Sequence, residues 1–213
     1  MQLTKKFEIQ SKQKIIDFLN SQPVGRIASI DERGYPQVIP MNFVYHDGTI
    51  YMHSHPFGEK LDNISRNPKV GFEVDQHICF LPSYYFHPTD ASQADTLYIS
   101  VVIKGEAEIV QNNDEKASAL NALMEKYQKE GQYERLDGYM SSVREVSIIS
   151  VTPTDLRGKY KVGQQWARPY RLKMARNIVK REGLKNAKTI LGIMGIDITA
   201  DGSGLHIKGD PVM

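Results

Sequence analysis

The chain contains 213 residues, of which 40% are hydrophobic and 24% are charged, and its formal net charge is +2. This composition is typical of a globular protein and excludes an intrinsically disordered one. The single cysteine, Cys79, excludes an internal disulfide framework and a zinc site made of cysteines alone. No apolar run approaches the roughly 20 residues of a membrane span. The N-terminus has no apolar signal core, so a cytoplasmic location is expected, with no membrane contact.

Charge is distributed unevenly along the chain. Residues 151–213 carry 12 Lys and Arg against 5 Asp and Glu, a net charge of +7, which leaves −5 for residues 1–150. A basic segment can bind nucleic acid, but no aromatic-interleaved basic motif accompanies this one. We therefore interpret the excess as a solvated helix face and do not expect a nucleic-acid partner.

Short strands with a few helices are predicted over most of the chain. In chain order these are a helix capped by Ser11 and ending near Asn20, strands Val24–Ile30, Gln37–Tyr45 and Thr49–His53, a helix Glu59–Arg66, strands Lys69–Asp75 and Thr96–Gln111, a helix capped by Asp114 and closed by Gly131, and a strand Ser147–Pro153.

Turn residues punctuate these elements. Asp31–Gly34 and His46–Gly48 are predicted turns, the second a hairpin because Asp-Gly favours the backbone angles it requires. Pro40 cannot donate to a ladder, so its position faces an edge, a bulge or a ligand. Gly105 is expected to interrupt its strand, and residues 76–95 are predicted to be irregular.

The pattern becomes helical from Pro169 onward. Gly183 is predicted to stop a first helix, a second short helix runs through Leu191, and the tail Ile196–Met213 is predicted to be a hairpin with an Asp201-Gly202 turn or a loose end. The fold class is therefore mainly β with helices: a six-stranded antiparallel β-barrel plus a C-terminal helical extension.

A polar loop holds Ser54, Gly58 and Lys60 where a strand feeds a helix. The N–H groups at a helix start are unpaired and the helix dipole favours negative charge there. Lysine supplies a point charge and serine a donor. We interpret the loop as a phosphate cradle; the alternative is a surface lysine beside a helix cap.

A longer pattern carries a family resemblance: G-R-I-A-S-I…G-Y-P-Q-V-I-P-M-N-F-V-Y…D-G-x-I-Y-x-H-S…G-x-K-L…N-P-x-V-x-F. It resembles the flavin-binding split-barrel proteins related to pyridoxamine 5′-phosphate oxidase, nearest the nitroimidazole-resistance-type branch. The match covers Val24–Val74, is weaker over Thr96–Gln111 and fades after Thr154. The resemblance implies an FMN-binding split-barrel domain over residues 1–158, and it leaves a basic, mainly helical extension over 159–213 unexplained.

The resemblance also implies a homodimer with two FMN sites at the subunit interface. The strand Gln37–Asn42 would line the flavin ring, partly through main-chain groups. His53, Ser54 and Lys60 would hold the phosphate. The cofactor-binding residues implied or considered are Gln37, Val38, Ile39, Pro40, Met41, Asn42, His53, Ser54, Gly58, Lys60, Ser100 and Trp166.

Three positions depart from the oxidase branch of this family. There an arginine stands where this chain has Gln37, a lysine where it has Asn42, and a basic residue where it has Glu59. A substrate phosphate would need arginines placed for bidentate contact, and that set is missing here. The departures argue against oxidation of pyridoxamine phosphate itself.

Several residues have alternative interpretations. His53 could contact FMN, be a half-buried strand residue, or bind a metal with His55, although the spacing with His77, Cys79 and His87 matches no standard zinc pattern and no metal site is predicted. Cys79 is interpreted as an inert filler.

Aromatic residues outside the family pattern also have two interpretations. Trp166 could stack on a ligand or fill an interface, and the run Tyr84–His87 could be a lid or a loop packed on the barrel. Arg26 and Ser100 are further candidate contacts.

The function predicted from the resemblance is that of an FMN-dependent oxidoreductase. It would take electrons from NADH, NADPH or another donor and reduce a small flat acceptor, nitroaromatic or quinone-like. No G-x-G-x-x-G motif is present and no catalytic side chain is assigned. The alternatives are a flavin-binding electron-carrying module without turnover, and a haem-binding split barrel with His87 or His206 as axial ligand. A deazaflavin cofactor is a further option.

Overall fold

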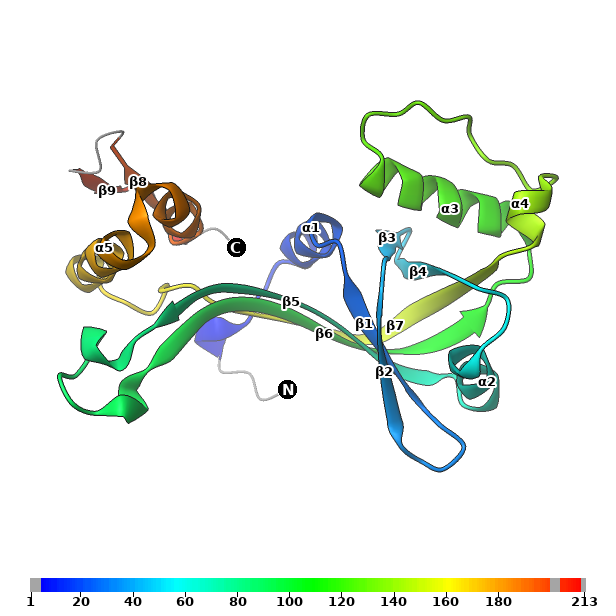
Figure 1. Ribbon diagram of the computed structural model, residues 1–213, viewed down its shortest axis with the longest axis horizontal. Helices are drawn as coiled ribbons and strands as arrows, with labels where there is room; N and C mark the ends of the chain where they lie inside the picture. Colours follow the sequence, from blue (N-terminus) through cyan, green and yellow to red (C-terminus); the bar gives the residue numbers. More distant parts are fainter. Residues whose placement is uncertain (1–4, 200–203, 212–213) are drawn as a thin grey trace. The chain divides into compact units, whose positions relative to one another are not determined.

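The computed structural model describes residues 5–199 and 204–211 (Figure 1). Its elements are η1 Lys5–Phe7, α1 Lys12–Ser21, β1 Gly25–Ile30, β2 Pro36–Met41, β3 Val44–His46, β4 Thr49–Ser54, α2 Glu59–Arg66, β5 Lys69–Leu81, η2 Ser83–Tyr85, η3 Ala91–Gln93, β6 Asp95–Ile109, α3 Asn113–Tyr127, α4 Ser141–Arg144, β7 Ser147–Lys161, α5 Arg168–Ile193, β8 Ile196–Ile198 and β9 Leu205–Ile207.

The chain divides into two compact units. One, here called the barrel unit, comprises Ser11–Asp75 and Val101–Arg157. The other, here called the terminal unit, comprises Met1–Gln10, Gln76–Ser100 and Gly158–Met213. The sequence-based boundary between residues 158 and 159 stays a prediction.

The main sheet curls without closing. Its strand order is β2-β1-β5-β6-β7-β4-β3, so β2 and β3 are its two edges. Yet β2 ends at Met41 and β3 begins at Val44. Three residue steps span at most about 11 Å, so the two edges must lie near each other and the sheet curls into a barrel. The pairings of β1 with β2 and β5, and of β4 with β3 and β7, are antiparallel. The predicted fold class, mainly β with helices and a split barrel, is confirmed, but over the described residues the sheet has seven strands and not the predicted six, because the second predicted strand is divided into two.

The predicted single strand Gln37–Tyr45 is wrong, because the chain leaves one edge of the sheet and joins the other within it. Asn42 and Phe43 make the crossing. The Phe43 side chain is fully buried, and its ring meets that of Phe72 edge-on at 5.1 Å. Burying this ring requires the backbone to turn, and the predicted second strand becomes β2 and β3.

Strands β5 and β7 are longer than predicted, β6 is one residue shorter, and the three run beside one another (Figure 1). The irregular segment expected at residues 76–95 is wrong for 76–81, where Cys79 and Leu81 are buried in alternation. Gly105 does not interrupt β6. A Cβ there would lie 2.6 Å from the Thr152 main-chain oxygen, so glycine permits the close approach of β6 and β7.

Local capping explains the helix starts. Ser11 caps α1 as predicted, its hydroxyl accepting from the Lys14 N–H at 3.4 Å. For α3 the cap is Asn112, and the prediction of Asp114 is wrong: the Asn112 side chain accepts from the N–H groups of Asp114 and Glu115 at 2.8 and 3.1 Å. Helix α3 packs against β3 and β4, and α2 packs against β1.

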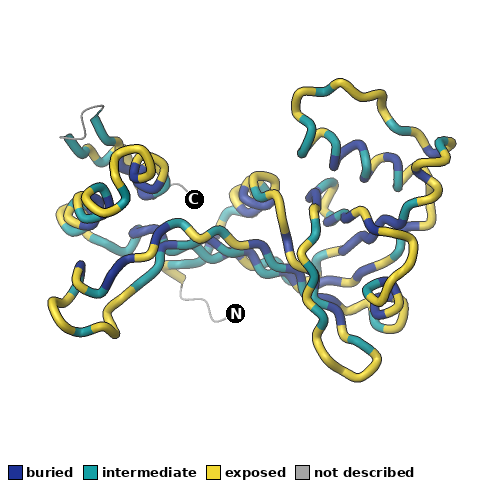
Figure 2. Tube along the Cα trace, in the orientation of Figure 1, coloured by how far each residue is buried: buried dark blue, intermediate teal, exposed yellow. Residues whose placement is uncertain are grey.

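The hairpin turn after β3 is confirmed, since Asp47 and Gly48 both have positive φ, 48° and 87°. The turn after β1 is exposed over Glu32–Pro36, whereas the buried positions lie on the strands (Figure 2).

The C-terminal helix breaks where predicted. Gly183 has φ 74° and ψ 160°, so α5 is two helices joined at that residue. Its buried face, including Met174, Ile178 and Leu191, joins a cluster with Leu81 and Leu97. Strands β8 and β9 pair antiparallel, as a hairpin requires. The predicted Asp201-Gly202 turn lies outside the described residues. Over the described part of the chain, no helix is long and apolar enough to span a membrane.

Candidate functional site

The edge strand β2 offers main-chain groups. Gln37, Ile39 and Met41 are half-buried, whereas Pro36, Val38 and Pro40 are exposed. Proline occurs in edge strands with its nitrogen facing away from the neighbouring strand. Because groups two residues apart share an edge, Pro36, Val38 and Pro40 direct their carbonyl groups outward. Pro36 and Pro40 have no main-chain N–H, so among these three residues only Val38, which is 58% exposed, directs an N–H outward. This agrees with the expectation that Pro40 faces an edge.

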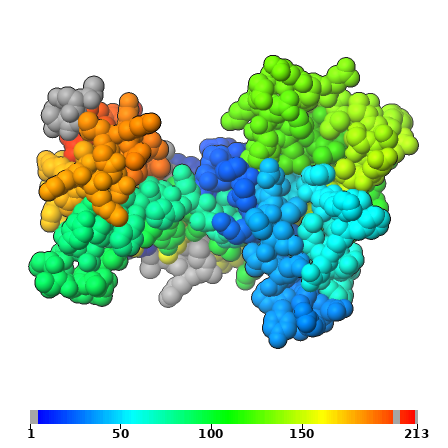
Figure 3. All heavy atoms as spheres, viewed as in Figure 1, coloured from blue at the N-terminus to red at the C-terminus, as the bar shows by residue number. Residues whose placement is uncertain are grey.

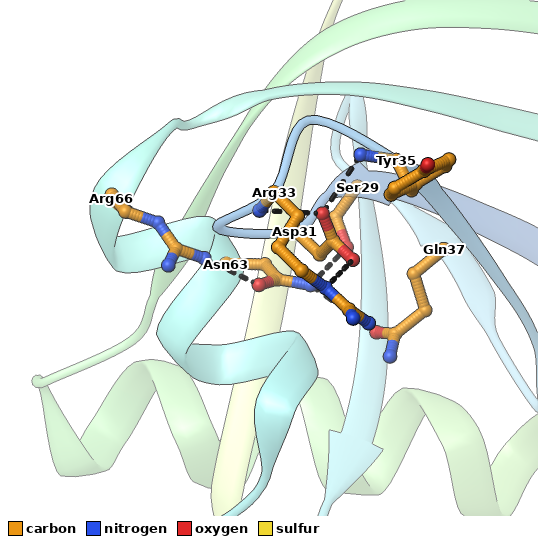
Figure 4. A network of polar contacts seen from close by, with 7 residues as sticks. All are labelled: Ser29, Asp31, Arg33, Tyr35, Gln37, Asn63 and Arg66. Atoms are coloured by element: carbon orange, nitrogen blue, oxygen red, sulfur yellow. Dashed lines mark hydrogen bonds and ion pairs between the residues drawn. The ribbon is translucent and has the colours of Figure 1, made fainter.

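A buried asparagine ties α2 to this strand (Figure 4). Asn63 is 1% exposed, and its amide nitrogen lies 3.4 Å from both the Ser29 hydroxyl on β1 and the Gln37 side-chain oxygen on β2. The Asn63 side-chain oxygen accepts from the Arg66 guanidinium at 2.6 Å. Lys60 lies one helical turn before Asn63, on the same helix face. The structure therefore brings Lys60 to the side of α2 that faces β1 and β2.

The connection from β4 to α2 contains the predicted phosphate cradle. Gly58 is the N-cap of α2, with φ 143°, and provides no side-chain cap. The N–H groups of Leu61 and Asp62 bind the Gly58 carbonyl at 2.9 and 3.4 Å. The N–H groups of Glu59 and Lys60 are thus the ones without an intrahelical acceptor. An anion would be stabilised there by these groups and by the helix dipole.

Ser54 ends β4 and its side chain is 3% exposed. The Ser54 hydroxyl donates to the His55 carbonyl at 2.9 Å, which fixes the start of the loop. His55 in turn accepts from the Phe57 N–H at 3.3 Å. His53 is exposed on β4, opposite Ile148 of β7, so the interpretation of a half-buried strand residue is wrong. The roles of His53 and Ser54 in binding stay predictions.

A polar cleft of about 330 Å³ opens beside the same helix. It is lined by four acidic residues, two arginines and Asn63: Asp31, Glu32, Arg33, Glu59, Asp62, Asn63 and Arg66. Four carboxylates against two guanidinium groups would repel a phosphate. The charge of this cleft therefore does not favour a phosphate, and the phosphate position at the helix start stays a prediction.

The crossing between β2 and β3 is held from α3, which sequence reasoning missed. The Tyr127 hydroxyl accepts from the Phe43 N–H at 2.9 Å and lies 3.0 Å from the Phe43 carbonyl and 2.7 Å from that of Pro23. The Lys126 ammonium donates to the carbonyls of Phe43 and Leu19 at 2.8 and 3.1 Å, and lies 3.7 Å from the Phe43 ring centre. These contacts fix the main chain next to Asn42. Burial lowers the pKa of Lys126 to about 8.

Arg26, a candidate contact, is already paired. Its guanidinium binds the carboxylates of Glu73 and Asp75. The hydrogen bond with Asp75 is the main reason that the pKa of Arg26 is raised. Burial raises the pKa of Glu73, since it outweighs the attraction of Arg26. No group of three or more possible metal ligands occurs in residues 5–199 and 204–211.

Ser100 and Trp166 belong to the terminal unit. Ser100 is half-buried on β6. Trp166 is half-buried and meets the Tyr170 ring edge-on at 5.8 Å. Tyr85, from the predicted lid, is 6% exposed and belongs to the cluster with α5, whereas Tyr84 is 64% exposed. Burial raises the pKa of the Cys79 thiol to about 11, which agrees with an inert filler.

Comparisons with known proteins concern mainly the barrel. A family model described as pyridoxamine 5′-phosphate oxidase matches residues 11–160. Among solved structures, a candidate 5-nitroimidazole antibiotic resistance protein from Bacteroides thetaiotaomicron is 28% identical, with a TM-score of 0.60, over 71% of this chain and 85% of that one. No curated protein sequence matches significantly.

Two further solved structures share the fold alone. The flavocytochrome Anf3 from Azotobacter vinelandii is 16% identical, with a TM-score of 0.63, over 75% of this chain and 72% of that one. An FAD and heme binding protein from Mycobacterium smegmatis is 14% identical, with a TM-score of 0.60, over 72% and 73%.

Proposed function

This chain belongs to the pyridoxamine 5′-phosphate oxidase family, and on that premise we propose that it binds FMN and acts as an oxidoreductase that reduces a small flat acceptor. The observation that carries the proposal is the coincidence of the family match with a barrel in which α2, whose start has no side-chain cap, is joined to the edge strand β2 through Asn63 and Gln37. The solved relatives support a flavin, because one is a flavocytochrome and another binds FAD and heme. The nitroimidazole-resistance relative supports a nitroaromatic acceptor.

The residues present fit a flavin phosphate and a flavin ring. Gly58 leaves the first N–H groups of α2 uncapped, and the half-buried Lys60 adds a positive charge. Along β2, the outward N–H of Val38 and the carbonyls of Pro36 and Pro40 can pair with the polar edge of the ring. Asn42 follows directly and adds a side-chain amide. The flavin, when bound, supplies the transfer of electrons; the chain binds it, orients it and sets its surroundings.

The same residues do not fit pyridoxamine phosphate as the substrate. Gln37 is held by Asn63, and it and Asn42 are neutral where a substrate phosphate would need a cation. A neutral, flat acceptor makes no such demand. We therefore assign the electron acceptor to the nitroaromatic or quinone class, with NADH or NADPH as the donor and the cytoplasm as the location.

The first experiment is the absorption spectrum of the purified protein and of its heat-released ligand. We expect a flavin spectrum with released FMN, anaerobic reduction by NADH or NADPH, and reoxidation by a nitroaromatic compound. A protein that takes up no flavin contradicts the proposal, and a Soret band would replace it with haem binding. Flavin that binds but is never reoxidised by the acceptors would support the electron-carrying module instead.

The phosphate assignment predicts a specific loss on substitution of Lys60. Lys60→Ala should weaken FMN binding about 10- to 150-fold, because a charged hydrogen bond is worth about 1.5–3 kcal/mol. Fluorescence titration of the apoprotein measures the affinity. Lys14→Ala, an exposed helix lysine of the same unit, is the matched control and should bind as the wild type does. Equal affinities for wild type and Lys60→Ala would place the phosphate elsewhere.

We also propose that the protein is a homodimer whose two flavin sites lie between the subunits. Tyr35 and Val38 at the open edge are 67% and 58% exposed, which leaves apolar surface for a second copy of the chain to cover. We expect sedimentation of the flavin-loaded protein to show a dimer and the monomer to carry no flavin. A flavin-loaded monomer would contradict the shared site.

A further inference from the structure

The terminal unit contains a cleft that the proposed function does not use. It has a volume of about 430 Å³ and is lined by Tyr84, Tyr85, Asn177, Lys180 and Arg181. Clefts that bind small ligands have volumes from about 300 Å³ upward. In Figure 3 the orange atoms of α5 lie against the blue-green atoms of the segment that contains Tyr84. Helix α5 lies beyond residue 160, outside the family match.

One wall of the cleft is a fixed pair of aromatic rings. Tyr85 is 6% exposed, and its hydroxyl donates to the Asn177 main-chain oxygen at 2.8 Å. The Tyr84 ring meets the Tyr85 ring edge-on, with 5.3 Å between centroids and 81° between planes. Tyr84 is 64% exposed. A tyrosine held at its edge by a buried neighbour, with much of its own surface open, is a platform on which a planar ring can stack.

The other wall is cationic. Arg181 donates through one nitrogen to the Phe80 carbonyl at 2.7 Å and lies 3.5 Å from the Glu182 carboxylate. The remaining guanidinium N–H groups of Arg181 have no partner within the described residues, nor has the Lys180 ammonium. No carboxylate lines the cleft, and Glu182 offsets only one of the two positive charges. The wall therefore attracts an anion and has donors left to bind it.

An amide completes the set. The Asn177 side-chain amide has no hydrogen-bond partner within the described residues, so it can both donate and accept within the cleft. An exposed lysine or an exposed tyrosine alone is ordinary surface. Here an open ring, unpaired cations and a free amide line one cleft. A mononucleotide, a planar base joined to a phosphate, uses all three.

We propose that this cleft of the terminal unit is a mononucleotide-binding site, with the base stacked on Tyr84 and the phosphate bound by Lys180 and Arg181. The site is independent of the proposed flavin site, whose residues belong to the barrel unit. Stacking tolerates any base, so one nucleotide serves as the probe.

The test is calorimetric titration of the full chain loaded with one equivalent of FMN to fill the flavin site. Excess FMN is removed, because FMN is itself a planar ring joined to a phosphate and would compete for the cleft. Adenosine 5′-monophosphate, adenosine and inorganic phosphate are the probes. We expect saturable binding of the nucleotide and at least tenfold weaker binding of adenosine and of phosphate. Affinity should fall with added salt, because the phosphate contact is ionic.

Two variants locate the site. Tyr84→Ala should weaken nucleotide binding about 5- to 100-fold, the range of one stacking contact. Lys180→Ala should weaken it about 10- to 100-fold, the range of one charged hydrogen bond. Tyr139→Ala, a tyrosine that is 84% exposed in the barrel unit, and Lys188→Ala, an exposed lysine of α5, are the matched controls and should bind as the wild type does. Absence of saturable binding overturns the proposal. So does binding that both Tyr84→Ala and Lys180→Ala retain, or binding that only Lys60→Ala removes, which would place the nucleotide in the flavin site.

Discussion

Replacing Tyr127 with phenylalanine is expected to lower the free energy of unfolding by about 2–4 kcal/mol. The Tyr127 hydroxyl is the acceptor of the Phe43 N–H and bonds the main-chain oxygen of either Pro23 or Phe43. Phe43 is fully buried, so its N–H cannot donate a hydrogen bond to water once the Tyr127 hydroxyl is removed. Phenylalanine keeps the ring, and the loss is therefore that of the hydrogen bonds and not of packing.

Urea unfolding at neutral pH measures this effect. Tyr139→Phe is the matched control, since Tyr139 is 84% exposed and its hydroxyl has no partner within residues 5–199 and 204–211. It should change the stability by less than about 0.5 kcal/mol. A similarly small change in Tyr127→Phe would mean that the Phe43 N–H finds another acceptor and that the Tyr127 hydroxyl does not hold the crossing.

The hydrogen bonds of Tyr127 to the crossing also link stability to the proposed function. Asn42 precedes Phe43 directly, and Met41 is the last residue of β2. A crossing released from Tyr127 would leave Asn42 free to sample positions away from a flavin edge. A folded Tyr127→Phe protein should therefore lose flavin affinity, whereas the phosphate contact through Lys60 would be unchanged.

The parts of the fold that could be predicted from the sequence are those determined by interactions between residues close together in the chain. Ser11 caps α1 because serine followed by a helical pattern suffices. Asp47-Gly48 forms the hairpin turn because few other residues accept positive φ at both positions. Gly183 breaks α5 for the same reason. In each case the deciding interaction lies beside the residue in the chain.

The division of β2 from β3 could not be predicted in that way. It depends on the burial of Phe43 against Phe72 and on Tyr127, which lies 84 positions further along the chain. Read locally, the segment from Gln37 to Tyr45 is one continuous β-like run interrupted only by Pro40. The length of β5 past Asp75 likewise depends on a cluster that α5 completes.

In the candidate site, the phosphate cradle follows from helix-start chemistry visible in the sequence, whereas the flavin-lining strand follows only from the resemblance. Lys60 and Gly58 match a family pattern, yet Asn63, which joins α2 to β1 and β2, carries no signal in a sequence. The position of Lys126, by contrast, does carry a signal in the sequence. Ala119, Ala122 and Leu123 are buried at helical spacing on α3, and Lys126 continues that stripe. A lysine on an apolar stripe indicates a buried amine with a structural partner.

That buried amine makes stability depend on pH. Burial lowers the pKa of Lys126 from its usual 10.5 to about 8, and its partners are the neutral carbonyls of Leu19 and Phe43. Between those two pH values the unfolded chain holds a proton that the folded chain has released. Stability therefore rises with pH across this window, by on the order of 2–3 kcal/mol, and the contribution is absent below about pH 8, where both states are protonated.

Lys126→Met should remove this rise, because methionine keeps an apolar stem and does not titrate. The measurement is the free energy of urea unfolding at pH 7.0, 8.0, 9.0 and 10.0 for wild type and variant. Cys79 and Tyr85, whose pKa values are raised by burial, act in the opposite direction at the upper end, and they cancel in the difference between the two proteins. Lys129→Met, at an exposed position just after α3, should follow the wild-type profile. Parallel profiles for wild type and Lys126→Met would contradict the lowered pKa of Lys126. They would mean that the Phe43 ring and the two carbonyls stabilise the ammonium form as well as water does, so that Lys126 stays charged in the folded protein at each of these pH values.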